Sequence, residues 1–301
     1  MTNMKQSGLA LIKKDTVDIV AERVRQFQEN GELYFPANYS AENAMKSAWL
    51  ALQETKDKNS KPVLEVCTKD SIANSLLDMV VQGLTPAKKQ CYFIAYGKQL
   101  TLHRSYFGTM AVAKRVRPTI TDIYADVVYV GDEFEYEKVH GKTVITKHIQ
   151  KLENVKKENI IAAYCTVLEG EKESSDIMTI DQIKQAWKQS KMNPVTDKGV
   201  ISASSVHGKF TEEMCKKTVI NRTCKPIINA SDDGSLLIKT IKKAEQDIEY
   251  AAVNDEIEQN ANVIEINDYD VDIDSGEVMN DENIVGDEDD HEMTEEADCG
   301  Y

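Results

Sequence analysis

The sequence predicts an α+β fold in which an antiparallel sheet and a hairpin pack against helices, followed by a disordered acidic C-terminal tail. Apolar residues recur at helical spacing from residue 15 to residue 80 and again after Gly170, whereas between these regions their period is two. Residues 251–301 hold 19 of the 51 acidic residues and no Lys or Arg. We therefore expect a folded core over residues 1–240, and a C-terminal helix with an acidic tail over residues 241–301.

The first three predicted helices have recognisable starts and ends. A helix over residues 15–27 has apolar side chains on one face and ends at Asn30-Gly31. Ser40 and Thr68 stand where N-caps would begin the second and third helices. Gly83 follows the third helix, where a left-handed backbone suits glycine. The side chains expected to point inward are Val17, Val20, Val24 and Phe27, then Met45, Ala48, Trp49 and Leu52, then Ile72, Leu76 and Val80.

The middle of the chain is predicted to form strands. Residues 91–95 and 99–103 flank Tyr96-Gly97-Lys98 as a hairpin, and a helix over residues 106–117 stops at Pro118. Residues 120–130, 133–139, 143–149 and 160–168 are four further strand candidates. Because Phe134 and Tyr136 alternate with acids, we expect an antiparallel sheet with one solvated face. Tyr92 and Phe93 are neighbours in a strand, so one of the two should be buried.

The helical pattern is expected to return after Gly170 and to last until about residue 254. Thr179 would cap a helix that buries Ile180, Ile183 and Trp187, and a loop over residues 190–204 would follow. A long helix is predicted over residues 205–224, with Phe210, Met214 and Thr218 stacked on one face. A last helix is marked by Leu237, Ile241, Ala244, Ile248 and Ala252. The segment beyond has the acidic, aromatic-poor composition of disorder.

The charge is divided between a mildly basic body and an acidic tail. All 36 Lys and Arg precede residue 251, together with 32 of the 51 acids, so residues 1–250 carry +4 although the whole chain carries −15. Such asymmetry often marks nucleic-acid-binding proteins, whose tails bind partners or compete with the polyanion.

One stretch of the body stands out because it contains no acid at all. Residues 79–121 hold seven Lys and Arg, one His and five aromatic residues, and no Asp or Glu. Cations interleaved with aromatic rings suit a surface that follows a phosphate backbone and stacks on bases. The alternative is a solvated basic face over an aromatic core. We favour nucleic acid as the ligand of this stretch.

Motifs for catalysis or for cofactor binding are not found. Gly141-Lys142-Thr143 lacks the preceding glycine of a phosphate-binding loop, because Tyr136 stands there. The Asp270, Asp272 and Asp274 run lacks the glycine and glutamate positions of a calcium loop. We expect no catalytic residue, no metal ligand set and no cofactor. A magnesium-dependent nuclease built from acids that meet only in space stays an alternative.

The cysteines and the termini predict a reduced, cytoplasmic protein. The six cysteines show no Cys-x-x-Cys and no zinc spacing, so we expect reduced thiols packed as small hydrophobes. No apolar run approaches the length of a membrane span, and residues 1–14 lack the features of a signal peptide. We expect no membrane association.

A second basic cluster lies in and after the predicted long helix. It comprises Lys209, Lys216, Lys217, Arg222 and Lys225. Lys209, Lys216 and Lys217 would share a stripe, with Glu212 and Glu213 roughly opposite. The alternative is an ordinary charged outer face, but two basic regions would together wall a groove. His207 is expected to be a capping or surface residue rather than a ligand.

With these residues assembled, the chain resembles the RecT family of phage single-strand annealing proteins, most closely those of Listeria prophages. One part of the resemblance is Gly83-Leu84-x-Pro86, Cys91-Tyr92-Phe93-Ile94-x-Tyr96-Gly97, Tyr106-x-Gly108 and Ala113-x-Arg115. The other part is Trp187-x-x-Ser190-Lys191-Met192, Glu213-Met214-x-x-Lys217-Thr218 and Asn221-Arg222-x-x-Lys225. Together these motifs cover residues 15–250, and an ordered series of this length is specific.

The resemblance implies an ATP-independent recombinase that binds single-stranded DNA and anneals complementary strands, with the α+β core of single-strand annealing proteins. It implies rings or helical filaments on DNA, a phage exonuclease as partner and contact of the C-terminal region with the host single-strand-binding protein. Residues 1–240 would then bind DNA and oligomerise. The alternatives of another class are a nuclease or strand-processing enzyme, and an assembly scaffold that binds DNA incidentally.

The candidate DNA-binding residues come from both basic regions and from the loop between them. The phosphate backbone would be held by cations of both clusters, and rings would stack or wedge at base steps. The candidates are Lys88, Lys89, His103, Arg104, Tyr106, Phe107, Lys114, Arg115, Arg117, Lys191, Asn193, Lys209, Lys216, Lys217, Arg222 and Lys225. The acidic tail would compete with DNA for this groove, so that truncation after Asn254 raises DNA affinity at low salt.

Overall fold

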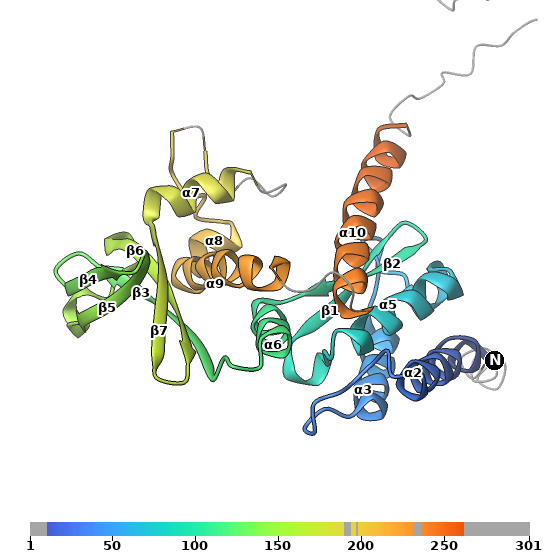
Figure 1. Ribbon diagram of the computed structural model, residues 1–301. Helices are drawn as coiled ribbons and strands as arrows, with labels where there is room; N and C mark the ends of the chain where they lie inside the picture. The colour runs from blue at the N-terminus through green and yellow to red at the C-terminus, as the bar shows by residue number, and fades with distance from the viewer. Residues whose placement is uncertain (1–10, 190–193, 197, 231–235, 262–301) are drawn as a thin grey trace, which may run out of the picture. The chain divides into compact units, whose positions relative to one another are not determined.

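The predicted α+β class is confirmed by the computed structural model, which describes residues 11–189, 194–196, 198–230 and 236–261, with side chains as far as residue 248. The chain up to Asp255 forms one compact unit, in which antiparallel strands pack with helices (Figure 1). The predicted boundary at residue 240, between a DNA-binding core and a C-terminal region, separates functions rather than packed units. It therefore stays a prediction. The predicted disorder of the acidic tail lies outside the described residues, as do Lys191 and Asn193.

The N-terminal helices begin and end close to where the sequence predicts. The elements are η1 (Lys14–Asp18), a turn of π-helix, then α2 (Ile19–Glu29), α3 (Ala41–Glu54), α4 (Val63–Val66) and α5 (Lys69–Val81). The Ser40 side chain accepts a hydrogen bond from the Asn43 amide, and the Thr68 side chain accepts one from the Ser71 amide. Both predicted N-caps are therefore confirmed. Phe27, expected inside, is only partly buried.

A two-stranded hairpin follows, and it leads directly into a helix. A 3₁₀ turn, η2 (Pro86–Lys88), precedes β1 (Cys91–Tyr96), β2 (Gln99–Arg104) and α6 (Tyr106–Val116). In the antiparallel register Tyr92 lies opposite His103. Helix α5 packs on β2, where the Ser75 hydroxyl donates to the Leu100 carbonyl at 2.8 Å. The hairpin is thereby held against the N-terminal helices.

The remaining strands form one antiparallel five-stranded sheet in the order β3-β6-β7-β5-β4. The strands are β3 (Asp122–Tyr129), β4 (Glu133–Val139), β5 (Lys142–Ile149), β6 (Ile160–Glu169) and β7 (Lys172–Thr179). Four of them agree with the predicted candidates. Strand β7 was not predicted, because its sequence Lys-Glu-Ser-Ser-Asp-Ile-Met-Thr has few apolar residues. It forms because β6 pairs with it along its whole length.

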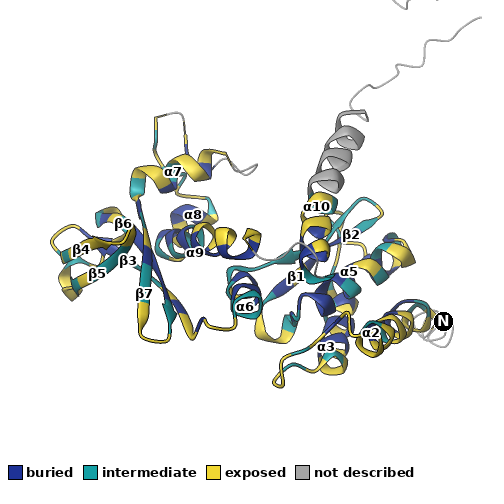
Figure 2. Ribbon diagram, viewed as in Figure 1, coloured by how far each residue is buried: buried dark blue, intermediate teal, exposed yellow. Residues whose placement is uncertain are grey.

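The edge strand β4 departs from its predicted alternation. Phe134 is half-buried against Tyr164, at 5.6 Å between ring centroids, but Tyr136 is exposed. A register shift between Glu135 and Tyr136 interrupts the pairing with β5, and a β-bulge of this kind re-aims the side chains that follow it. Figure 2 shows the edge strand β4 mostly exposed, in contrast to β6, which lies between β3 and β7 in the sheet.

The C-terminal helices are α7 (Ile180–Lys188), α8 (Val206–Lys209), α9 (Thr211–Asn229) and α10 (Leu236–Ala261). The predicted cap of α7 is confirmed, since Thr179 and Gln182 form a capping box. The predicted single helix over residues 205–224 is wrong. It breaks at Phe210, whose backbone leaves the helical region and whose side chain is exposed. Helix α10 continues seven residues beyond the predicted limit at Asn254.

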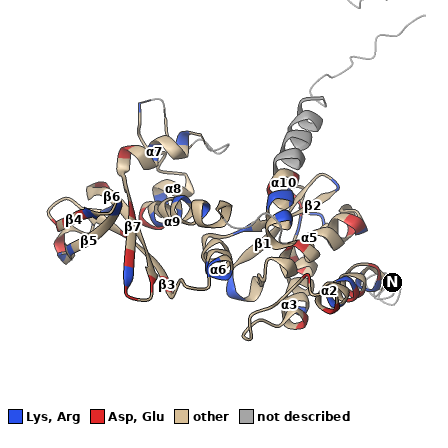
Figure 3. Ribbon diagram, in the orientation of Figure 1, with Lys and Arg blue, Asp and Glu red and all other residues tan. Residues whose placement is uncertain are grey.

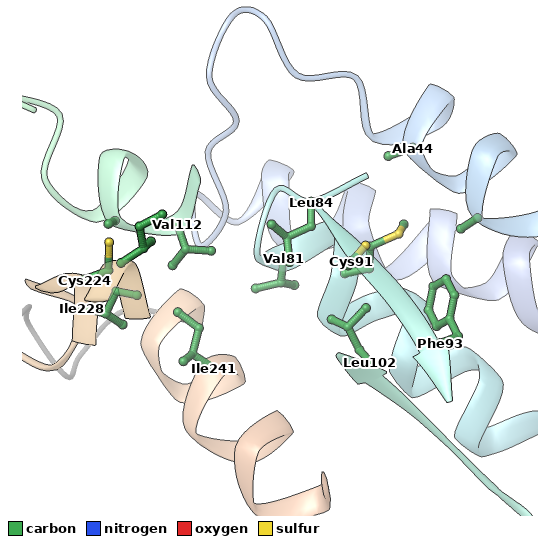
Figure 4. Packing of buried hydrophobic residues seen from close by; sticks show 14 of the residues in the cluster. Ala44, Val81, Leu84, Cys91, Phe93, Leu102, Val112, Cys224, Ile228 and Ile241 are labelled. Atoms are coloured by element: carbon green, nitrogen blue, oxygen red, sulfur yellow. The ribbon is translucent and has the colours of Figure 1, made fainter. Parts of the chain in front are cut away.

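Helix α9 connects the sheet to the hairpin region. It contacts β3, β6 and β7, and also α6. The hydrophobic core is continuous across these elements, and Figure 4 shows Val81, Val112, Ile228 and Ile241 meeting from α5, α6, α9 and α10. Five cysteines of the described residues are free and buried, as predicted. Burial raises the pKa of the Cys91 and Cys224 thiols to about 12, so both remain protonated at neutral pH.

Neither a metal centre nor a membrane span is found in the part of the chain that the structure describes. None of its Cys, His, Asp or Glu residues gather in threes as metal ligands would. None of its helices combines the length and the apolar composition needed to cross a bilayer.

Asp78 of α5 is a buried carboxyl beside α10, and within the described residues its side chain makes no hydrogen bond. Burial raises the pKa of Asp78 to about 7, with a smaller opposing effect of Lys243 and a smaller raising effect of Asp247. Between about pH 4 and pH 7, Asp78 is therefore protonated in the folded protein and ionised in the unfolded chain. This contribution favours folding below about pH 4, and it is lost as the pH rises through 7.

We expect Asp78→Asn to increase the free energy of unfolding at pH 8 by up to about 4 kcal/mol and to change it little at pH 4, because the amide never charges. Urea denaturation at the two pH values measures this difference. Asp176→Asn, at an exposed residue of β7, is the control and should show the same small change at both. A gain for Asp78→Asn that is equal at pH 4 and pH 8 would contradict the assignment.

Candidate nucleic-acid interface

Residues 85–90 place two lysines on the surface just before the hairpin. The Thr85 hydroxyl accepts a hydrogen bond from the Ala87 amide and caps η2, after which Lys89 adopts a left-handed backbone with φ +53°. The Ser105 hydroxyl donates to the Lys89 carbonyl at 2.7 Å and accepts from the Gly108 amide at 3.2 Å. The backbone of Lys89 is thereby fixed to the first turn of α6.

Gly108 permits the close approach of these two segments. A Cβ at this position would lie 2.1 Å from the Gln90 carbonyl oxygen. The same carbonyl accepts the Ser105 amide at 3.0 Å. The sequence Ser-Tyr-Phe-Gly over residues 105–108 therefore brings two aromatic rings beside Lys89.

A cleft of about 470 Å³ opens at this junction, and we call it the Lys89 cleft. It is lined by Pro86, Lys89, Cys91, Tyr92, Ser105, Tyr106, Phe107 and Lys217. Lys217 comes from α9, which packs against α6. The two basic regions of the sequence, more than 100 residues apart, thus contribute one lysine each to the same cleft.

Aromatic rings form the apolar surface of the Lys89 cleft. Tyr92 and Phe107 are each 45% exposed, and the Tyr106 and Phe107 rings lie 4.1 Å apart between centroids. Phe93 is buried, so the prediction that one of Tyr92 and Phe93 is buried is confirmed. Exposed rings between lysines are the elements from which a base-stacking surface is built.

His103 stacks between two tyrosines of the hairpin. Its ring lies 6.2 Å from that of Tyr92 and 5.9 Å from that of Tyr96, between centroids. Burial lowers the pKa of His103, so the imidazole is neutral at pH 7. His103 therefore extends the aromatic surface and adds no charge at that pH.

Six of the predicted cations form neither an ion pair nor a side-chain hydrogen bond within the described part of the chain. They are Lys88, Lys89, Lys209, Lys217, Arg222 and Lys225. All are exposed except Lys217, which is half-buried in the cleft. Lys88 also lines a second cleft of about 310 Å³ with Lys114 and Gln90. These six side chains keep their charge available to an external anion.

Three other predicted cations pair with carboxylates of this chain. Lys114 lies 2.9 Å from Asp122 and Arg117 lies 3.1 Å from Glu169, while Lys216 lies 2.7 Å from Glu212 and 3.4 Å from Asp126. The predicted stripe on α9 is therefore wrong in two respects. Glu212 lies beside Lys216 rather than opposite it, and the break at Phe210 places Lys209 on α8. Figure 3 shows the basic residues of α6.

Arg115 is bound to the backbone of two other elements. Its guanidinium donates to the Val81 carbonyl at 2.6 Å and to the Tyr34 carbonyl at 2.9 Å, and it lies 5.7 Å from the centroid of Phe35. Gly83, with φ +68° as predicted, leaves room for it, since a Cβ there would lie 2.6 Å from a guanidinium nitrogen. Arg115 joins α6 to the ends of α5 and of the segment after α2.

Arg104 is also engaged, and it lies in a separate cavity of about 300 Å³. Its guanidinium donates to the Gln82 side-chain oxygen at 3.0 Å and to the Glu245 carboxylate at 2.8 Å. The cavity walls include Asn221 and Lys225 of α9. We call this the Arg104 cavity.

His207 does not lie on the surface and does not act as a cap, contrary to expectation. It is buried, with its ring 4.7 Å from that of Trp187 between centroids, and Ser205 caps α8 instead. Its Nδ1 has no hydrogen-bond partner among the described atoms. Burial, and then the charge of Lys217, lowers the pKa of His207.

Most of the residues that line these two sites were absent from the predicted set. Tyr92 and Ser105 line the Lys89 cleft, and Gln82 and Asn221 line the Arg104 cavity. The strand alternation of Tyr92 with Phe93 was a usable signal for Tyr92. Asn221 belongs to the motif Asn221-Arg222-x-x-Lys225, which was a usable signal for it. Gln82 carries no charge or ring, so no pattern in the sequence distinguishes it.

Comparison with protein families matches residues 42–264, well over half of the chain, to the RecT family. No curated protein and no solved structure is significantly similar to the chain. The match covers every element from α3 to α10, and with them both the Lys89 cleft and the Arg104 cavity.

We expect Arg115→Gln to lower the free energy of unfolding by about 2–3 kcal/mol, because two backbone carbonyls would lose a charged donor. Lys217→Gln, the matched control in the Lys89 cleft, should change it by less than about 0.5 kcal/mol. Urea denaturation of both variants measures the difference. Equal losses for the two variants would argue against the structural role of Arg115.

Proposed function

The chain belongs to the RecT family, and from that premise we propose how it binds and pairs DNA strands. Membership makes it a phage single-strand annealing protein of DNA recombination. We propose that it binds single-stranded DNA through the Lys89 cleft and the cations around it. It then presents the bound strand to a complementary one without ATP. That the chain is most similar to family members from Listeria prophages stays a prediction.

The observation that carries this proposal is the joining of Lys89 and Lys217 at one aromatic cleft. Two lysines that pair with none of the described carboxylates flank Tyr92, Tyr106 and Phe107. Lysines neutralise phosphates whatever the sequence, and rings stack on any base, at about 1–3 kcal/mol per base. This combination suits a protein that must accept every sequence.

Annealing depends on whether the protein holds the DNA strand by its phosphates or by its bases. If lysines hold the phosphates, the base edges stay free to pair with a second strand. Neutralising one backbone also lowers the repulsion that the second backbone meets. The free energy then comes from binding and base pairing, so the reaction requires no nucleotide hydrolysis.

Fifteen of the sixteen predicted residues, all except Arg104, divide into groups in this proposal. The six cations without an ion pair contact phosphates directly, and His103, Tyr106 and Phe107 stack on bases. Lys114, Arg117 and Lys216 would exchange a carboxylate of this chain for a phosphate, whereas Arg115 supports the site from behind. Lys191 and Asn193, outside the described residues, would contribute from the loop before α8.

We also propose self-association into a ring or helical filament, with a phage exonuclease and the host single-strand-binding protein as partners. Two features support self-association. Strands β3 and β4 are the open edges of the sheet, where backbone groups can pair with another chain. Leu11, Ile19 and Leu50 are exposed on the N-terminal helices. The C-terminal region, from residue 241, would contact the host protein.

We expect the double variant Lys89→Glu/Lys217→Glu to bind single-stranded DNA at least about tenfold more weakly at low salt. The slope of log K against log salt should flatten by roughly 1.4, because each neutralised phosphate contributes about 0.7. Fluorescence anisotropy with a labelled oligonucleotide measures both quantities. Energy transfer between two labelled complementary strands, without ATP, measures annealing.

Lys142→Glu/Lys172→Glu is the matched control, since it changes the net charge equally at exposed positions of β5 and β7. Binding and salt slope that are the same in the two double variants would refute the Lys89 cleft as the DNA site. Magnesium-dependent shortening of the oligonucleotide would instead support a nuclease. Annealing no faster than the uncatalysed rate would support a scaffold.

A further inference from the structure

The guanidinium of Arg104 forms a hydrogen bond with one neutral side chain and an ion pair with one carboxylate. The neutral partner is Gln82, which is itself 2% exposed and lies at the end of α5. The anionic partner is Glu245 of α10, whose side chain is 56% exposed, whereas that of Arg104 is 16% exposed. Gln82 thus orients the guanidinium, and the other edge receives an anion from the solvent side.

The surroundings of this ion pair are rich in hydrogen-bond donors. The Arg104 cavity holds Lys225 and Asn221 of α9 and His103 of β2 in addition to Arg104, and Glu245 is its one acidic lining residue among those described. A planar guanidinium with one free edge binds carboxylate and phosphate oxygens in the same geometry. A phosphodiester could therefore take the place of the carboxylate with the same donors around it.

Helix α10 brings Glu245 to the cavity by packing rather than by charge. Ile238, Ile241 and Ala244 of α10 are buried, and Ile241 and Ala244 also line the cavity. Glu245 is the next residue after Ala244, at the exposed margin of that apolar face. The helix therefore delivers a carboxylate to Arg104 whether or not DNA is present.

We propose that the Arg104 cavity is a phosphate subsite for single-stranded DNA and that Glu245 occupies it as an internal anion, which the DNA backbone displaces. The inference rests on the proposed function and adds a way in which DNA binding is regulated. It also names an internal competitor within the folded core. This carboxylate lies in α10, before Asn254, and the competition predicted for the acidic tail stays a separate prediction.

The consequence is a reduced affinity for DNA. A site that is open in only a fraction of the molecules has an apparent dissociation constant equal to the intrinsic constant divided by that fraction. Removing the Glu245 charge opens the subsite in all molecules. The gain should shrink as salt rises, because screening weakens the partly exposed Arg104–Glu245 pair in the wild-type protein.

The test is Glu245→Gln in the full-length chain, with fluorescence anisotropy of a labelled oligonucleotide as the readout. The amide keeps the shape of the side chain and removes its charge. We expect binding roughly threefold to tenfold tighter at low salt, and a smaller gain at high salt. Glu171→Gln, in the exposed turn between β6 and β7, is the control with the same change of net charge.

Two further variants separate the alternatives. Truncation after Asn254 keeps Glu245 and should not reproduce the gain beyond a general charge effect. Arg104→Gln/Glu245→Gln should lose the gain of Glu245→Gln, because the anion site itself is gone. Glu245→Gln affinity equal to that of Glu171→Gln would overturn the inference, and so would an equal gain in the Arg104→Gln background.

Failure of the inference and failure of the proposed function give different results. If the wild-type protein does not bind or anneal single-stranded DNA, the proposed function is wrong. If it does both and Glu245→Gln behaves as the control does, only the role of Glu245 is wrong.

Discussion

The packing of α9 against both the sheet and α6 is the constraint on which the rest of the structure depends. One face of α9 buries Cys215, Val219 and Cys224 fully, and the helix contacts β3, β6 and β7 as well as α6. Because an α-helix is rigid over this length, the position of one contact fixes the others. Lys217 can therefore lie beside Lys89, and Asn221 and Lys225 can lie beside Arg104, only while α9 keeps both contacts.

The cations of the chain have two different roles, which the amino-acid composition alone does not distinguish. Arg115 donates to backbone carbonyls that would otherwise lack a donor, and its loss would loosen α6. Lys89 and Lys217, by contrast, have aromatic neighbours and form no ion pair with a carboxylate in the described residues. Arginine suits the first role, because its fork serves two acceptors at once, and lysine suits the second, because its charge turns freely toward a moving phosphate.

Helix α10 lines the Arg104 cavity, the proposed phosphate subsite. It packs over the hairpin side of the core, places Lys243 and Asp247 near the buried Asp78, and places Glu245 on Arg104. A partner that binds this helix would act on the same contacts. Under the proposed function, a host single-strand-binding protein that contacts this helix would change DNA affinity through Arg104.

The sequence by itself determined the local structure of this protein. Ser40, Thr68 and Thr179 mark helix starts because a short polar side chain can satisfy an amide, and Gly83 marks a helix end because its backbone is left-handed. These are effects of neighbours along the chain. Strand β7 escaped detection because its pairing with β6 holds it. The break at Phe210 escaped detection because the nearby glycine, Gly208, lies inside α8 and has no left-handed backbone. The acid-free composition of residues 79–121 identified the basic and aromatic surface, but only the tertiary structure decided which of its charges remain unpaired. That outcome depends on carboxylates such as Glu245, which lies 141 residues from Arg104 along the chain. A local sequence pattern does not indicate which distant residues the core will bring together.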